Sequence, residues 1–133
     1  MSEIQNNVNN TNTIKHKELS YRIVGLAQGI HRTLGPGFPE AVYHKAFCHE
    51  LVKTKIPFEN EKSVDVFYDG LCCGTFRLDI LVDNKIAVEL KAIAAINGEH
   101  VAQVISYLKA TNLDLGILIN FGRSSLETKR VVL

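Results

Sequence analysis

Between residues 63 and 91, apolar and polar residues alternate in three successive segments, and no other feature of the sequence constrains the fold as strongly. Successive side chains of a β-strand point to opposite faces of a sheet, so a period of two indicates strands. The segments are residues 63–68, 73–82 and 86–91. Asp69 and Gly70, between the first two, are typical of a tight hairpin turn. The sequence therefore predicts three consecutive strands joined by hairpins.

The second hairpin has a register that the apolar residues determine. Paired residues point to the same side of a sheet, so the apolar faces match only in two pairs, Val82 with Ile86 and Ile80 with Val88. This pairing requires a loop with an odd number of residues, most simply 83–85. The same register places Asp79 opposite Glu89, with Lys91 on the same face. Two carboxylates and a lysine are therefore expected to converge.

Apolar residues recur at helical spacing before the strands. A first helix is expected from about Glu18 to Leu34, where the segment 35–37 with its two glycines ends it. A second helix should begin near Pro39, because proline is favoured at the first helical position, and run to about Lys55. These two helices supply apolar faces that need a sheet to cover.

The chain after the three strands is expected to complete the sheet. Asn97 can cap a third helix over about residues 98–112. Residues 113–121 are almost continuously apolar, which is typical of a strand buried on both faces in a parallel pair. Residues 127–133 can add an edge strand. The whole order predicts an α/β fold with a mixed sheet flanked by helices.

The length of 133 residues suits one domain. Residues 1–14 contain five asparagines and little to bury, so we expect a disordered tail followed by a single domain over residues 15–133. Hydrophobic residues make up 46% and charged residues 22%, which excludes a disordered chain and a coiled coil. The formal net charge of +1 neither indicates nor excludes nucleic-acid binding, because a local basic patch is enough.

Several features indicate a cytoplasmic protein that does not bind membranes. The sequence has no run of 18 apolar residues, and its first residues lack the apolar stretch of a signal peptide. Its three cysteines are odd in number and form no CxxC pair, which suits a reducing compartment.

Glu89 is unusual because it places a charge in an otherwise apolar strand. Burying an unpaired carboxylate costs several kcal/mol, so Glu89 should be paired, metal-bound or exposed. With Asp79 opposite, a hard divalent cation such as Mg²⁺ would satisfy both acids, and Lys91 would orient a water or stabilise charge on a phosphate. A cross-strand ion pair, or an exposed sheet face, is the alternative reading of the same pattern.

Five stretches carry a more specific pattern. They are residues 31–43 (HRTLGPGFPEAVY), 76–82 (FRLDILV), 88–92 (VELKA), 103–107 (QVISY) and 118–121 (LINF). In content and order they resemble the GxxExxY proteins, a small branch of the PD-(D/E)XK nuclease superfamily. The resemblance implies a restriction-endonuclease-like fold with an αβββαβ core and an extra N-terminal helix. It also implies a metal-dependent nuclease, with DNA favoured over RNA as the substrate.

The resemblance further implies roles for individual residues. The groups that would hold Mg²⁺ or Mn²⁺ are the acids Asp79, Glu89 and Glu40 and the main-chain carbonyl of Leu90. Lys91 matches the catalytic lysine that acts with these acids. Gln103 and Tyr107 match a QxxxY motif that faces the active site and the end of the nucleic acid.

Two other classes of function stay open at this point. One is a non-catalytic module on the nuclease fold that binds nucleic acid or a protein, and the other is a small-ligand protein whose acidic site holds a cation. A chain of 133 residues has little room for a separate recognition domain, so activity could require a homodimer or a protein partner.

Overall fold

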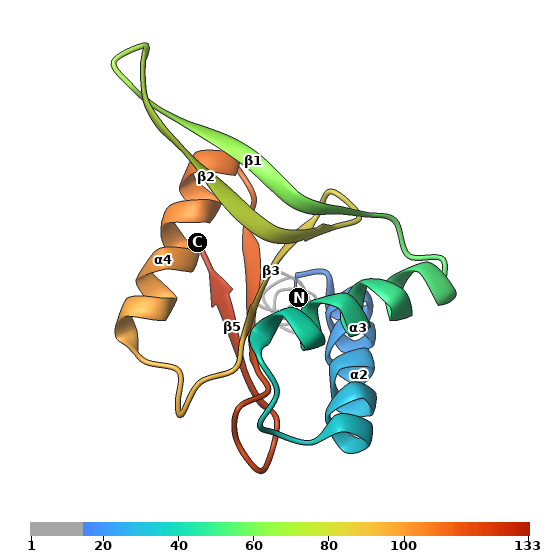
Figure 1. Cartoon of the computed structure of the whole chain (residues 1–133). Helices are drawn as coiled ribbons and strands as arrows, with labels where there is room; N and C mark the ends of the chain where they lie inside the picture. Colours follow the sequence, from blue (N-terminus) through green and yellow to red (C-terminus); the bar gives the residue numbers. More distant parts are fainter. Residues whose placement is uncertain (1–14) are drawn as a thin grey trace, which may run out of the picture.

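The structure, a computed structural model, describes residues 15–133, which form a five-stranded sheet with helices on both faces (Figure 1). The strands lie in the order β1-β2-β3-β4-β5. Only β3 and β4 pair in parallel among these neighbours. The strands are β1 (Phe58–Tyr68), β2 (Leu71–Val82), β3 (Ile86–Lys91), β4 (Leu115–Asn120) and β5 (Glu127–Val132). The predicted mixed α/β fold and its C-terminal edge strand are confirmed, whereas the predicted tail lies outside the described residues.

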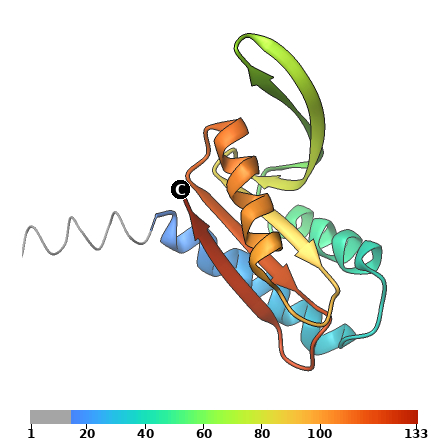
Figure 2. The same ribbon diagram turned by 90° about the vertical axis from the view of Figure 1, so that its left-hand side faces the viewer.

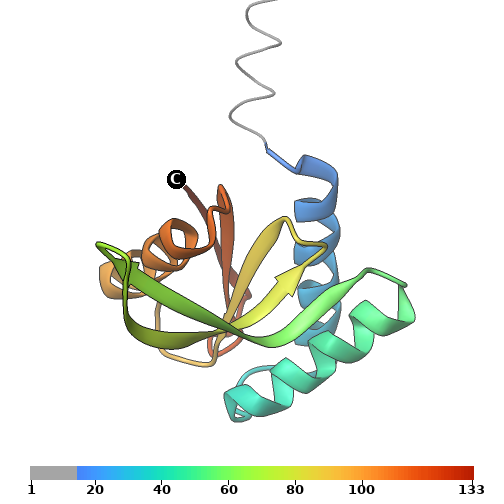
Figure 3. The same ribbon diagram turned by 90° about the horizontal axis from the view of Figure 1, so that it is seen from above.

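The sheet separates the hydrophobic core into two layers, each covered by helices. α2 (Lys17–Leu34) and α3 (Glu40–Lys53) pack on one face of the sheet, and α4 (Gly98–Thr111) packs on the other, as Figure 3 shows. The strand residues Ile80 and Val88 belong to the first layer, whereas Leu81 and Ala87 belong to the second. Neighbouring strand residues therefore bury opposite faces, as the period of two predicts.

The beginning of α3 differs from the prediction by one residue. Pro39 is the N-cap, with φ −62° and ψ 154°, and Glu40 is the first helical residue. The extended ψ of Pro39 excludes it from the helix, although its φ would suit either conformation. Glu40 still lies in the first turn, where the helix dipole favours a negative charge.

The register of the second hairpin is confirmed. Val82 pairs with Ile86, Ile80 pairs with Val88, and the loop is the odd one of residues 83–85. Asp83 and Asn84 adopt positive φ angles of 52° and 54°, a conformation that these two residue types tolerate better than most. The cap of α4 is also confirmed, because the side chain of Asn97 accepts hydrogen bonds from two amides of the first turn.

The first hairpin is longer than the sequence pattern indicates. β1 begins at Phe58 rather than near residue 63, and its pairing with β2 extends to Val82. Residues 58–62 (FENEK) show no alternation of apolar and polar residues, so the pattern could not reveal this part of the strand. Glu61 has a φ of 52°, yet the register is the same on both sides of it, and the pairing shifts only between Val66 and Phe67. The far end of the β1–β2 ribbon projects beyond the rest of the protein (Figure 2). None of the helices in residues 15–133 is long and apolar enough to cross a membrane.

Candidate active site

Asp79 and Glu89 meet where strands β2 and β3 stop pairing. The last paired residues at this end are Ile80 and Val88. One step beyond, the Asp79 amide donates a 3.3 Å hydrogen bond to Oε1 of Glu89. The Leu90 amide in turn donates a 3.1 Å hydrogen bond to Oδ2 of Asp79. Side-chain oxygens thus take the place of main-chain carbonyls, and two carboxyl groups are held in the gap between the strands.

Lys91 is the cationic group beside these acids. It is the last residue of β3, and its Nζ lies 3.8 Å from Oε2 of Glu89. Its side chain is only 18% exposed, so solvent screens this interaction less than at an open surface. The main-chain carbonyl of Lys91 accepts a hydrogen bond from the Phe121 amide, which anchors the end of the strand.

Glu89 is almost completely buried, with 4% of the residue exposed. Burial is the main reason that the pKa of Glu89 rises to about 8, and the negative charge of Asp79 acts in the same direction. The hydrogen bond from the Asp79 amide and the charge of Lys91 oppose this rise without cancelling it. The carboxyl group therefore has less positive charge around it than its ionised form requires.

Glu40 approaches the same acids from the N-terminus of α3. The residue as a whole is exposed, yet its carboxyl end is partly desolvated, and this together with the charge of Asp79 raises the pKa of Glu40. Lys91 and His44 lower the same pKa. Glu40, His44 and Asp79 share the lining of a cavity of about 380 Å³ between α3 and the strands.

We did not predict a role for His44 from the sequence. It lies four residues after Glu40, so the two side chains occupy one face of α3, and this spacing is the signal that could have identified it. The ring Nε2 of His44 lies 2.5 Å from Oδ1 of Asn60 on β1, which fixes the imidazole at the cavity wall.

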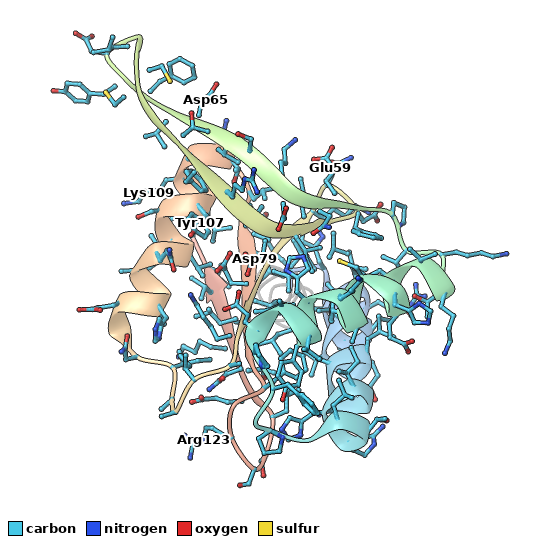
Figure 4. All side chains as sticks on the ribbon, viewed as in Figure 1. Glu59, Asp65, Asp79, Tyr107, Lys109 and Arg123 are labelled. Carbon is cyan, nitrogen blue, oxygen red and sulfur yellow. The ribbon has the colours of Figure 1, made fainter. Side chains whose placement is uncertain are left out.

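Tyr107 belongs to α4, on the face of the sheet opposite α3, and lies near Asp79 and Glu89. Figure 4 labels it together with Asp79. Its ring stacks on Phe76 at a centroid distance of 4.5 Å, and the residue is 8% exposed. Burial, followed by the charges of Glu89 and Asp79, raises the pKa of Tyr107 to about 12. The hydroxyl therefore stays protonated and can donate a hydrogen bond toward the acidic gap.

Gln103 lies one helical turn before Tyr107 on α4 and is exposed. Within residues 15–133, no hydrogen bond joins its side chain to the carboxylates. The structure thus brings together Asp79, Glu89, Lys91, Glu40 and Tyr107, and leaves Gln103 at the surface nearby.

The side chain of Asn120 holds the chain segment next to the site by hydrogen bonds. It is fully buried at the end of β4, where its Oδ1 accepts hydrogen bonds from the amides of Ile93 and Gly122. Its Nδ2 donates to the carbonyl of Ile93 and to Oε1 of Glu127. These bonds fix the chain that follows Lys91. The signal in the sequence is a polar residue at the end of an apolar run, and we did not predict this role.

The donor groups suit a hard divalent cation. Mg²⁺ takes oxygen ligands, typically one or two carboxylates together with waters and carbonyls. Asp79 and Glu89 offer carboxylate oxygens in a place where added positive charge would relieve their repulsion. No cluster of three His, Cys, Asp or Glu side chains suited to a metal occurs in residues 15–133. Any cation here would therefore depend on two carboxylates and non-side-chain ligands.

Comparisons with known proteins agree with this architecture. In sequence, no curated protein matches the chain. The solved structures that it resembles include the crystal structure of SSO0001, with a TM-score of 0.54 and 18% identity, covering 69% of this chain and 48% of that one. The chain thus spans about half of SSO0001, and the likeness bears on the fold alone. A family model described as the PD-(D/E)XK nuclease superfamily matches residues 17–131. Because this match includes every strand and helix described above except the last residue of β5, the chain belongs to the PD-(D/E)XK nuclease superfamily.

Proposed function

We propose that this protein is a metal-dependent nuclease that hydrolyses phosphodiester bonds, with DNA as the preferred substrate. The observation that carries the proposal is the pair of carboxyl groups of Asp79 and Glu89 in the gap between two strands, with Lys91 beside them. Membership of a nuclease superfamily supports the same reading.

In this proposal, Asp79, Glu89 and the carbonyl of Leu90 hold Mg²⁺ or Mn²⁺, with Glu40 close to the ion. The bound ion would supply positive charge to the scissile phosphate and lower the pKa of a water. The ammonium group of Lys91 would orient the attacking water and stabilise the negative charge that develops on the phosphate oxygens. Lys91 is suited to this role because its side chain is only 18% exposed and its Nζ lies 3.8 Å from Oε2 of Glu89.

The proposed role of Tyr107 is hydrogen bonding rather than base stacking. Phe76 already covers one face of its ring, and the residue is nearly buried, so its hydroxyl is the group left to act. The hydroxyl would donate to a phosphate oxygen or to a water in the site. Gln103, exposed on the same helix, would bind the nucleic-acid strand at the rim.

We further propose that the chain belongs to the GxxExxY branch of the superfamily. Gly37, Glu40 and Tyr43 have the spacing of that motif. Tyr43 is fully buried, and its hydroxyl bonds the carbonyl of Gly35 and the amide of Phe38, so it fixes the loop that leads into α3. In this reading, the motif tyrosine positions the N-terminus of α3, and the helix then directs Glu40 toward the acids.

A cleavage assay tests the proposal directly. Labelled single- and double-stranded DNA and RNA are incubated with the protein in a Mg²⁺ or Mn²⁺ titration, and the wild type is compared with Lys91→Ala. We expect metal-dependent cleavage that falls by about 100-fold or more in the variant, the usual scale for losing one electrostatic group in an active site. Lys85→Ala is the matched control, because Lys85 is exposed at the opposite end of β3 and should leave cleavage unchanged. Equal cleavage by wild type and Lys91→Ala would contradict the proposal, and binding without cleavage at every metal concentration would favour the non-catalytic module.

A further inference from the structure

The far end of the β1–β2 ribbon exposes a concentration of apolar side chains. We call residues 65–73 the hairpin tip. Four of its apolar residues are exposed, namely Val66 at 39%, Phe67 at 64%, Tyr68 at 76% and Leu71 at 66%. A two-stranded ribbon cannot bury such residues by itself. Exposed apolar groups gathered in this way mark interaction surfaces.

The charge of the tip argues against nucleic acid as its partner. A β-ribbon can enter the major groove of DNA, but binding the phosphate backbone requires Lys or Arg. Residues 63–76 contain neither, and they include the acids Asp65 and Asp69. In residues 15–133, no ion pair compensates either aspartate. Asp65, labelled in Figure 4, accepts only the hydroxyl hydrogen bond of Thr75. The tip therefore suits an apolar protein surface with a positive rim.

Such a surface lies between α2 and α3. We call it the α2–α3 groove, a cavity of about 750 Å³ with the apolar side chains Ile30, Leu34, Val42 and Ala46 in its lining. Its rim carries Lys45, His49 and Lys53, with Glu50 as the only acid among the lining residues. Glu50 pairs with Lys53 at 3.4 Å, whereas Lys45 has no ion-pair partner within residues 15–133. The groove thus combines an apolar floor with uncompensated positive charge.

The tip cannot occupy the groove of its own chain. Figures 1 and 3 both place the hairpin tip and the helices α2 and α3 on opposite sides of the molecule. A second copy of this chain offers a matching tip, because every copy carries both an acidic apolar tip and a basic apolar groove.

We propose that two copies of this chain associate by inserting the hairpin tip of each into the α2–α3 groove of the other. A two-fold arrangement makes this contact twice and closes the assembly, whereas a single contact repeated in one direction would build open chains. Phe67 and Tyr68 are the apolar anchors, since large aromatic residues dominate interface energetics. Asp65 lies near Lys45 of the second copy, which gives the contact its charge complementarity. The inference does not depend on the nuclease activity.

Sedimentation equilibrium of the full chain at micromolar concentrations is the test. We expect a reversible monomer–dimer equilibrium for the wild type. The double variant Phe67→Ser/Tyr68→Ser and the groove variant Val42→Glu should each dimerise at least about tenfold more weakly. Val52→Glu is the matched control, because Val52 is 65% exposed on the same helix as Val42 but is not part of the groove lining. Circular dichroism on each variant establishes that the fold is retained.

Two further measurements separate this contact from any other dimer. Mixing the tip variant with the groove variant leaves one intact tip and one intact groove. The mixture should therefore associate through one contact, more strongly than either variant does alone. Asp65→Lys and Lys45→Glu should each weaken dimerisation, and their combination in one chain should restore it. A monomeric wild type, a dimer insensitive to these variants, or a mixture that associates no more strongly than either variant alone would each overturn the proposal.

Discussion

The main-chain amide of Asp79 donates a hydrogen bond to the side-chain carboxyl group of Glu89. This bond lies one residue beyond the last main-chain pair of strands β2 and β3. Where the two strands stop pairing, they enclose a gap that is lined by carboxyl oxygen atoms. The paired parts of the sheet hold this gap in place. This arrangement concentrates negative charge in a buried position, and the first predictions test what that charge does.

Divalent metal should stabilise the protein. A ligand that binds only the folded state stabilises it by about 2.7 kcal/mol when its concentration is 100 times its dissociation constant. We therefore expect Mg²⁺ or Mn²⁺ at millimolar concentration to raise the melting temperature of the wild type. Asp79→Asn should abolish the rise, whereas Asp65→Asn, at the exposed hairpin tip, should retain it. An unchanged melting temperature in the wild type would count against a metal site at Asp79.

Without divalent metal, stability should fall as the pH rises, because the pKa of Glu89 is raised by burial to about 8. A carboxyl group whose pKa is higher in the folded state than in the unfolded chain favours folding below its unfolded pKa. That contribution is lost as the pH rises through about 8. Glu89→Gln removes the charge, so it should be more stable than the wild type at pH values above 8, by at least about 1 kcal/mol. Urea unfolding in a chelating buffer across this pH range measures the effect, and parallel pH profiles for the two proteins would refute it.

Tyr107→Phe should reduce cleavage while leaving stability nearly unchanged. The substitution removes the hydroxyl but keeps the ring that stacks on Phe76. We expect about a tenfold loss or more in rate, with an intact Mg²⁺-dependent thermal shift. Gln103→Ala should behave in the same way, and Ser106→Ala is the control on the exposed side of α4. If Tyr107→Phe destabilises the fold and leaves the rate unchanged, the hydroxyl has only a structural role.

Asn120→Ala should destabilise the protein strongly. It removes four hydrogen bonds from a buried position and leaves both main-chain groups of Ile93 without their partner. Each unsatisfied buried group costs about 1–3 kcal/mol, so we expect a loss of about 3 kcal/mol or more in the free energy of unfolding. Urea denaturation gives this value, with Asn60→Ala as the control at an exposed asparagine. A loss below about 1 kcal/mol would show that water replaces the side chain.

Gly122→Ala should be destabilising for a different reason. A Cβ at this position would lie 2.3 Å from the main-chain carbonyl oxygen of Ile93, so the segment after β3 would have to move. Since that segment follows Lys91 directly, we expect lower stability together with lower cleavage in the folded fraction. Gly74→Ala is the matched control, because a Cβ there meets no atom within 4 Å. Equal stability of the two variants, measured by thermal unfolding, would contradict the expectation.

The sequence alone determined the faces and the register of the sheet. Alternating apolar residues assigned Ile80 and Val88 to one face, and matching the faces across an odd loop gave the pairing that the structure shows. The cap at Asn97 and the buried parallel strand β4 follow from equally local rules. These features were predictable because they depend on residues close in the chain or on a strict period of two.

Only the tertiary structure decided which groups meet around Asp79 and Glu89. The position of His44 in the cavity wall, the stacking of Tyr107 on Phe76 and the support from Asn120 join elements far apart in the sequence. Their distances depend on how helices pack on a twisted sheet, and no local pattern specifies that packing. The same holds for the hairpin tip. Its alternating residues predicted a strand, but whether that strand packs on the core or projects from it depends on where the rest of the sheet ends.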